Sequence, residues 1–278
     1  MKFIKSPLRY PGGKSRAIAE ISQQLPEVFS EYREPFVGGG SVFIFIRQKF
    51  PDVHVWINDK NYDLYCFWHT VQTNAQGLVY KLFKIKKEMT DGKQLFHLLR
   101  NNLNEQLSEF ERAVRFFVLN RVSFSGTVDC GGYSEQAFQS RFTDSSINRI
   151  LTLAPLLQEV RITHLDYREV IHEDGEDIFI FLDPPYLTAK KSRLYGKNGD
   201  LHLTFQHEQF AEEMKQCNHR WMITYDDSPI IRNHFRFAHV HQWQLQYGMN
   251  NFKQNIAAKG KELIITNYFS YHKQLCFL

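Results

Sequence analysis

A five-residue apolar run that ends in an acidic, proline-containing turn is the feature that most restricts the fold. Residues 178–182 read Ile-Phe-Ile-Phe-Leu, and Asp183, Pro184, Pro185 and Tyr186 follow directly. A strand that is buried on both faces of a parallel sheet has such a continuous apolar sequence. Parallel strands are joined by long crossovers, usually helices, so this run predicts an α/β architecture.

Other segments fit the same alternation of strands and helices. Further strands are predicted at 53–58, 160–165, 221–225 and 262–266, and amphipathic or helical segments at 145–158 and 207–217. A first strand at 34–37 leads into a turn of three glycines, 38–40. Residues 41–47 favour strand by local propensity, but Ser41 can cap a helix and a crossover must follow, so we predict a helix there.

The middle of the chain departs from this alternation. Residues 78–119 have helical spacing, and 122–142 are rich in Ser, Gly and Thr, which favours a hairpin or loop. Between 77 and 150 there are 11 Lys and Arg against 8 Asp and Glu. We therefore predict a catalytic domain that is interrupted by a mostly helical insertion. The predicted bounds are 1–62 and 148–278 for the catalytic domain and 63–147 for the insertion.

The composition excludes several classes. Hydrophobic residues make up 43% and charged residues 23%, as in folded globular proteins. The longest apolar runs have five residues, whereas a membrane span needs about 20, so neither a membrane helix nor a signal peptide is expected. The four cysteines are scattered, which is typical of a reducing cytosol, and no metal-ligand spacing occurs. A net charge of +4 with 15% aromatic residues makes nucleic acid a candidate partner.

The glycine turn and the next strand suggest a nucleoside pocket. Asp59 stands 19 residues after Gly40, where a carboxylate can accept hydrogen bonds from both ribose hydroxyls. The alternative is that Asp59 caps a helix at 60–70. The dinucleotide fingerprint fails because Phe43 stands where its third glycine is required.

A second turn, residues 10–15, reads Tyr-Pro-Gly-Gly-Lys-Ser. It is not a phosphate-binding P-loop, because Leu8 stands where the first glycine is required and no strand precedes it. What remains is a glycine turn that presents an aromatic ring, Tyr10, and a cation, Lys14. The alternative is an ordinary surface turn.

The turn after the apolar run offers two acceptors and a flat ring at one rigid point. Asp183 supplies carboxylate oxygens, Pro184 a carbonyl and Tyr186 an aromatic face. Such a set suits the exocyclic amino group of a planar base, whose lone pair is delocalised into the ring. Acceptors on both N–H bonds pull the nitrogen toward a tetrahedral shape and free that lone pair. The alternative is a tight turn with a packed tyrosine.

Seven motifs, in this order, resemble those of the Dam-like DNA adenine-N6 methyltransferases. They are SPLRYPGGKS at 6–15, EPFVGGGSVF at 34–43, IND at 57–59, LNRVSFSG at 119–126, RFTDSSINR at 141–149, FLDPPY at 181–186 and KELIITNY at 261–268. The resemblance implies S-adenosylmethionine (SAM) as methyl donor, without a metal. It also implies a Rossmann-like, mixed seven-stranded sheet with one antiparallel strand and an inserted target-recognition domain.

The same resemblance implies the site residues. Around the cofactor it places Tyr10, Lys14, Phe36, Gly38, Gly40, Asp59, Asp166 and Asp183, and it assigns catalysis to Asp183, Pro184, Pro185 and Tyr186. The target adenine is expected to be flipped out of double-stranded DNA and stacked on Tyr186, with its N6 held by Asp183 and the Pro184 carbonyl. Transfer is then direct, with no covalent enzyme intermediate.

The DNA contacts are expected on either side of the catalytic turn. Candidates are Asn120, Arg121 and Tyr133 in the insertion, and Lys190, Lys191 and Arg193 after the turn. We hypothesise that the last three clamp the flipped strand. Residues 119–142 lack the Asn-Val-Pro-Phe-Gly stretch of members that read GATC, so another target sequence is expected. We expect a cytoplasmic monomer, with a cognate restriction endonuclease as a candidate partner.

Three alternatives remain at this point. One is transfer to cytosine N4 or to adenine in RNA, although cytosine-N4 enzymes more often carry Ser before the two prolines. Another is a dinucleotide oxidoreductase, against which the missing third glycine argues. The last is a non-catalytic DNA-binding relative, against which the intact Lys14, Asp59, Asp183 and Tyr186 argue.

Overall fold

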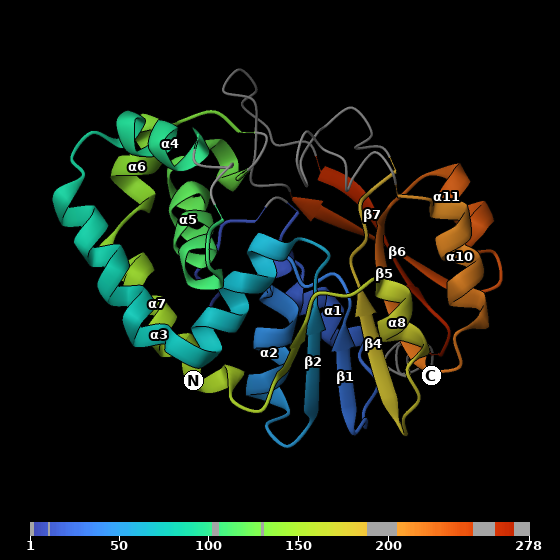
Figure 1. Ribbon diagram of the computed structural model, residues 1–278. Coiled ribbons are helices and arrows are strands. Elements are labelled where there is room, and N and C mark those ends of the chain that lie inside the picture. Colours follow the sequence, from blue (N-terminus) through green and yellow to red (C-terminus); the bar gives the residue numbers. More distant parts are fainter. Residues whose placement is uncertain are drawn as a thin grey trace.

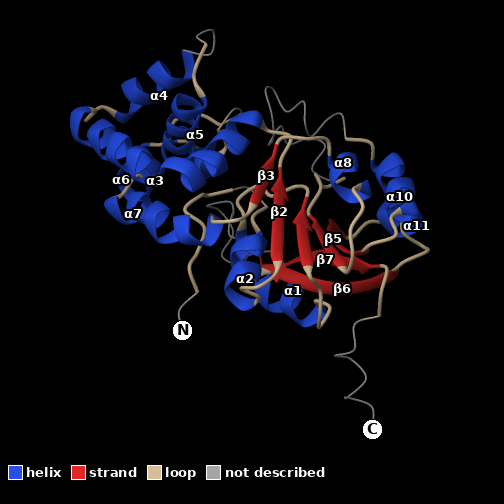
Figure 2. Ribbon diagram, turned by 60° about the horizontal axis from the view of Figure 1, so that its bottom comes forward, coloured by secondary structure: helices blue, strands red, loops and turns tan. Residues whose placement is uncertain are grey.

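The structure is a computed structural model that describes residues 3–10, 12–101, 106–128, 131–187, 205–246 and 259–269. Its centre is a seven-stranded sheet in the order β3-β2-β1-β4-β5-β7-β6 (Figures 1 and 2). The strands are β1 (Glu31–Glu34), β2 (His54–Asn58), β3 (Arg161–Thr163), β4 (Ile178–Leu182), β5 (Arg220–Asp226), β6 (His239–Gln246) and β7 (Lys259–Thr266). β7 runs antiparallel to both of its neighbours, and the other pairs are parallel. The expected fold class, with one antiparallel strand, is confirmed.

β4 is buried on both faces, as its continuous apolar sequence predicts. Phe179 and Phe181 belong to the core on one face, and Ile178, Ile180 and Leu182 to the core on the other. The helices α1 (Ile18–Gln24) and α2 (Ser41–Lys49) contribute to the first core. The helices α8 (Tyr167–His172), α10 (His207–Gln216) and α11 (Pro229–His234) contribute to the second.

Helices from the middle of the chain gather beside the sheet (Figures 1 and 2). They are α3 (Tyr62–Glu88), α4 (Gly92–Asn101), α5 (Glu109–Val122), α6 (Glu135–Arg141) and α7 (Asp144–Leu153), with short 3₁₀ turns at Phe124–Gly126 and Ala154–Leu157. Asp63 at the start of α3 forms ion pairs with Arg112 and Arg115 of α5, which holds these two helices together. The bounds 63 and 147 of the insertion stay a prediction.

Local details differ from the expectation around the first strand. The first strand is Glu31–Glu34 and not 34–37 as predicted, and it ends before Pro35, which has no N–H to donate to a neighbouring strand. The helix α2 is present, but its N-cap is Gly40 and not Ser41, and Gly40 offers no side-chain cap. The carboxyl group of Glu34 instead accepts a hydrogen bond from the backbone N–H of Phe43, in the first turn of α2.

The parallel strands place their carboxyl ends at one edge of the sheet. The strand order reverses between β1 and β4, since the chain continues to β2 on one side and to β5 on the other. Ligands of open α/β sheets bind beyond the carboxyl ends at such a reversal. Among the helices in the described ranges, none combines the length and the apolar sequence needed to cross a membrane.

Candidate active site

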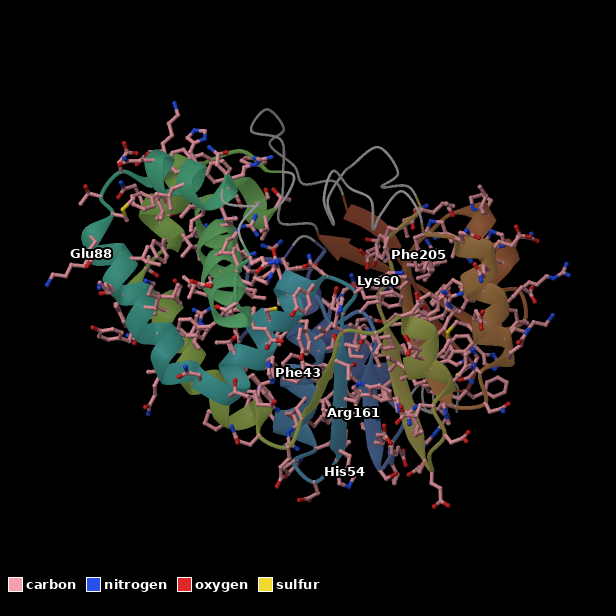
Figure 3. All side chains as sticks on the ribbon, viewed as in Figure 1. Phe43, His54, Lys60, Glu88, Arg161 and Phe205 are labelled. Atoms are coloured by element: carbon pink, nitrogen blue, oxygen red, sulfur yellow. The ribbon has the colours of Figure 1, made fainter. Side chains whose placement is uncertain are left out.

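The predicted motifs meet beyond the carboxyl ends of β1, β2 and β4. Figure 3 shows Lys60, just after β2, and Phe205 at this end of the sheet, and His54, the first residue of β2, at the opposite end. The glycine turn follows β1, Asp59 follows β2 and Asp183 follows β4. The segment around Tyr10 and Lys14 packs onto the same edge, as the contacts below show.

Lys14 and Asp183 form the central contact of the site. The Lys14 Nζ lies 2.7 Å from Oδ2 of Asp183 and also donates to the carbonyl of Gly12 at 2.8 Å. The Thr224 hydroxyl on β5 donates to the other oxygen, Oδ1, at 2.8 Å. Lys14 is only 4% exposed and Asp183 is 21% exposed. Both oxygens of Asp183 are therefore held in fixed directions, with lone pairs left for a further donor.

The aromatic ring of Tyr10 lies on the glycine turn. A Cβ atom on Gly38 would stand 2.9 Å from Cε1 of Tyr10, so only glycine permits this approach. Gly38 and Gly40 both have positive φ, +45° and +69°. The Trp68 indole N–H donates to the carbonyl of Gly38 at 3.2 Å, which fixes the turn from the side of α3.

Asp59 joins the glycine turn to the start of α3. Its Oδ2 accepts the backbone N–H of Gly38 at 3.0 Å, and its Oδ1 accepts that of Asn61 at 2.9 Å. Burial raises the pKa of Asp59 to about 6, although these two hydrogen bonds lower it. The helix itself is capped by Asn61, whose side chain accepts the N–H of Leu64, so Asp59 is not its N-cap.

Glu34 is a buried acid beneath this group that the sequence analysis did not single out. Its side chain is 2% exposed and accepts a hydrogen bond of 2.6 Å from the Tyr32 hydroxyl. Burial, aided by the charges of Asp183 and Asp59, raises the pKa of Glu34 well above its usual range, although the Tyr32 hydroxyl lowers it. The signal of Glu34 in the sequence is the acidic residue directly before Pro35.

Aromatic rings and Asp166 flank the other side of the glycine turn. The ring of Phe36 lies 5.4 Å from that of Tyr167 and 5.8 Å from that of Phe205. Asp166 caps α8 and forms ion pairs with Lys60 and Arg168. Burial opposes its ionisation, but the hydrogen bonds from Arg168 and Lys60 outweigh burial and lower the pKa of Asp166 to about 2.

The proline-containing turn presents Tyr186 next to Lys14. The ammonium of Lys14 lies 4.9 Å from the centroid of the Tyr186 ring. The Tyr186 hydroxyl donates to Oε2 of Glu262 on β7 at 3.3 Å. The backbone N–H of Leu187 donates to Asp226 on β5 at 3.0 Å. Pro184 is buried and Pro185 is half-buried, so the turn is packed against the end of the sheet.

The predicted DNA contacts fall into different surroundings. Asn120 is fully buried, and its amide bonds with both backbone groups of Arg9 and with the carbonyl of Gly126, so it joins the amino-terminal segment to α5. Tyr133 is half-buried, and its hydroxyl donates to Glu135. Lys190, Lys191 and Arg193 lie outside the described residues.

Arg121 is buried among other cations. It is 4% exposed, and its Nε has no hydrogen-bond partner among the residues that the structure describes. Burial, together with the charges of Arg149, Arg9 and Arg141, lowers the pKa of Arg121 to about 9. Arg149 donates to the carbonyl of Ser6, and the Arg121 guanidinium lies 5.4 Å from the centre of the Phe117 ring.

The described part of the chain holds no group of three or more His, Cys, Asp or Glu arranged to bind a metal ion. The site is instead built from a glycine turn, two strand-end carboxylates, a lysine and aromatic rings, on a sheet with one antiparallel strand. This combination defines an α/β methyltransferase.

The comparison with known proteins narrows this class. The sequence profile of the family described as D12 class N6 adenine-specific DNA methyltransferase matches residues 10–249. The chain therefore belongs to this family, and it is a DNA methyltransferase that acts on the N6 of adenine.

Several relatives carry consistent names. The chain is 24% identical to the Type II methyltransferase M1.LlaDCHI of Lactococcus lactis subsp. cremoris, over 94% of each chain. It is 26% identical to a DNA adenine methylase of Vibrio cholerae, over 72% of each chain. It is 29% identical to the DNA N-6-adenine-methyltransferase of Escherichia phage P1, over 83% of this chain and 31% of the relative.

The glycine turn generates a first prediction. An added methyl group at Gly40 would lie 2.3 Å from Cε1 of Phe43 and 2.8 Å from Cζ2 of Trp68, at a positive φ. We expect Gly40→Ala to destabilise the protein by about 1–3 kcal/mol, because strain and overlap act together. Chemical denaturation followed by circular dichroism measures this change.

The matched control is Gly132→Ala. Gly132 is exposed, and an added Cβ there would have nothing within 4 Å. We expect a change within about 0.5 kcal/mol for it. Equal effects of the two substitutions would contradict the role assigned to the glycine turn.

Proposed function

We propose that SAM binds over the glycine turn and that a flipped adenine meets it at the turn after β4. The observation that carries this proposal is the convergence of Asp183, Lys14 and Tyr186 beside the turn at Gly38. Methyltransferases of this family use SAM in general. When bound, it supplies an activated methyl group on a positively charged sulfur.

The residues present fit this cofactor. Gly38 and Gly40 have positive φ, and the Tyr10 ring packs directly on Gly38, so the turn has a fixed shape beside which the cofactor can lie. Asp59 retains lone pairs for the two ribose hydroxyls, since each of its oxygens accepts one backbone N–H. Phe36 belongs to an aromatic wall suited to the adenine ring, and Asp166 lies at the end of the neighbouring β3.

We propose that Asp183, Pro184 and Tyr186 hold the target base. Adenine N6 is not accessible inside a duplex, so the base must leave the stack. Asp183 Oδ atoms and the Pro184 carbonyl accept the two N6 hydrogens, and Tyr186 stacks on the ring. Lys14 and Thr224 fix the carboxylate in advance, so little reorganisation is needed when the base arrives.

The proposal extends to DNA binding. Arg121 is buried beside three further arginines, Arg9, Arg141 and Arg149, and no group in the described part of the chain bonds with its Nε. Burying a guanidinium among like charges is costly unless an anion joins it. A phosphate of the DNA backbone is such an anion, and arginine binds it in bidentate geometry.

The assignment of Asn120, Tyr133, Lys190, Lys191 and Arg193 to DNA stays a prediction from the sequence.

We further propose that one chain acts on double-stranded DNA as a monomer, in the cytoplasm where such DNA lies. All the catalytic and cofactor residues named above come from one chain, which supports this. The name of the Lactococcus relative, a Type II methyltransferase, supports a cognate restriction endonuclease as partner.

The catalytic proposal is tested by methylation of DNA with SAM. Asp183→Ala should lower the rate of N6-methyladenine formation by about 100- to 1,000-fold, because it removes a fixed acceptor of the N6 hydrogen. Sequencing that detects methylated bases identifies the product and the target sequence together. Product formation by Asp183→Ala at the wild-type rate, or methylation of cytosine, would refute the proposal.

The ionisation of Asp59 makes cofactor binding depend on pH. Burial raises the pKa of this group to about 6. Ribose hydroxyls donate to the ionised carboxylate, so binding favours the ionised form and lowers that pKa. We therefore predict that SAM affinity is full above the pKa and falls as the pH drops through about 6. Isothermal titration calorimetry at several pH values measures this fall.

Asp59→Asn serves as the control for that titration. It keeps the size of the side chain and removes the titrating group. Its SAM affinity should be weaker than that of the wild type and flat across the same pH range. A fall of the same steepness in Asp59→Asn would show that another group is responsible.

The arginine cluster is tested by the salt dependence of DNA binding. Arg121→Met should weaken binding about equally for all sequences and reduce the slope of log affinity against log salt by about one, because one phosphate contact is lost. Arg236→Met, an exposed arginine after α11, should change neither quantity. An unchanged slope in Arg121→Met would contradict the phosphate contact. The same measurement on alanine variants of Lys190, Lys191 and Arg193 tests the proposed clamp.

A further inference from the structure

A buried carboxylate faces the catalytic turn from the antiparallel strand. Glu262 lies on β7, opposite Asp226 of β5, and its side chain is 0% exposed. The three residues that follow it, Leu263, Ile264 and Ile265, are buried and apolar. The Tyr186 hydroxyl donates to its Oε2 at 3.3 Å.

The loss of water around the buried side chain of Glu262 has to be compensated by hydrogen bonds within the protein. Burying a carboxyl group away from water is unfavourable unless hydrogen bonds replace those it made to water. The Tyr186 hydroxyl supplies one such bond, which joins the end of its ring to β7.

The hydrogen bond to Glu262 holds the hydroxyl end of the Tyr186 ring, and other groups contact the rest of the ring. The Tyr225 ring lies 5.9 Å away at 31°, and the Lys14 ammonium lies 4.9 Å from the ring centroid. Asp226 holds the backbone just after the ring, at Leu187 N–H. The hydroxyl oxygen lies on the axis of the terminal torsion of tyrosine, so the bond to Glu262 fixes the direction of the long axis of the ring and not its rotation about that axis. The β5–β7 pair thus determines both the backbone and the ring direction of Tyr186.

We propose that Glu262 is a positioning residue that orients the Tyr186 ring for stacking on the target adenine. This inference rests on the proposed role of Tyr186 toward the flipped base. Its physical effect is preorganisation: the ring is held before DNA binds, so less ordering remains to be done in the complex. Glu262 itself touches neither the base nor the cofactor in this account.

A double-mutant cycle separates this role from a merely structural one. Glu262→Leu removes the acceptor and fills the space with an apolar side chain, and Tyr186→Phe removes the hydroxyl and keeps the ring. Each should lower the single-turnover rate of adenine methylation by about tenfold, the loss of one buried hydrogen bond. Because both remove the same bond, the double variant should be no slower than the slower single variant. SAM affinity without DNA should be unchanged in both.

Glu262→Gln keeps an acceptor oxygen and the size of the side chain and should recover most of the rate, which a role of the negative charge would not predict. The inference is overturned if the two effects multiply to about 100-fold in the double variant, or if Glu262→Leu is slow while Tyr186→Phe is not. If the wild type methylates adenine but the cycle shows no coupling between Glu262 and Tyr186, this inference alone is refuted. Absence of any adenine methylation by the wild type would refute the proposed function as well.

Discussion

The ion pair between Lys14 and Asp183 joins parts of the chain that are 169 positions apart. It ties the amino-terminal segment to the end of β4, across the edge of the sheet where the strand order reverses. The ring of Tyr10 rests on the glycine turn within the same segment. A nearly buried lysine requires its partner, because a lone ammonium in that place would be strongly unfavourable. The geometry of the cofactor and catalytic residues therefore depends on this one contact.

The charges around the Lys14–Asp183 ion pair suit the transfer of a methyl group to an amino group. Three acids lie at the ends of β1, β2 and β4, namely Glu34, Asp59 and Asp183, with Lys14 among them. Burial raises the pKa of Glu34 well above its usual range and so disfavours its ionisation. The remaining carboxylates can face a positively charged methyl donor and the hydrogens of an amino group, both of which favour negative charge nearby.

The sequence predicted the parts of this arrangement that have a local signal. β4 follows from its continuous apolar run, and the strand-end acids follow from the alternation of strands and helices. The pairing of Lys14 with Asp183 has no local signal, since only the fold brings the two together. Thr224 and Glu262 were missed for the same reason: each lies within a strand and acts on a side chain from another one. β6 was missed because this edge strand carries mostly polar residues.

The DNA-binding expectations show where residue type alone is insufficient. Asn120 and Arg121 are neighbours in the sequence, yet the first bonds with backbone groups inside the protein. The second lies among arginines, and its Nε finds no partner within the described ranges. Only the surroundings of each side chain separate a structural role from a candidate phosphate contact.

A crystal structure with a non-reactive SAM analogue and DNA that contains the target sequence tests the central claim most directly. The account predicts an adenine outside the helix, stacked on Tyr186, with N6 within hydrogen-bond distance, about 3 Å, of both the Asp183 carboxylate and the Pro184 carbonyl. The Lys14–Asp183 contact should be kept in that complex. An adenine that stays stacked in the duplex, or one whose N6 is bound by other groups while Asp183 remains closed off by Lys14, would contradict it.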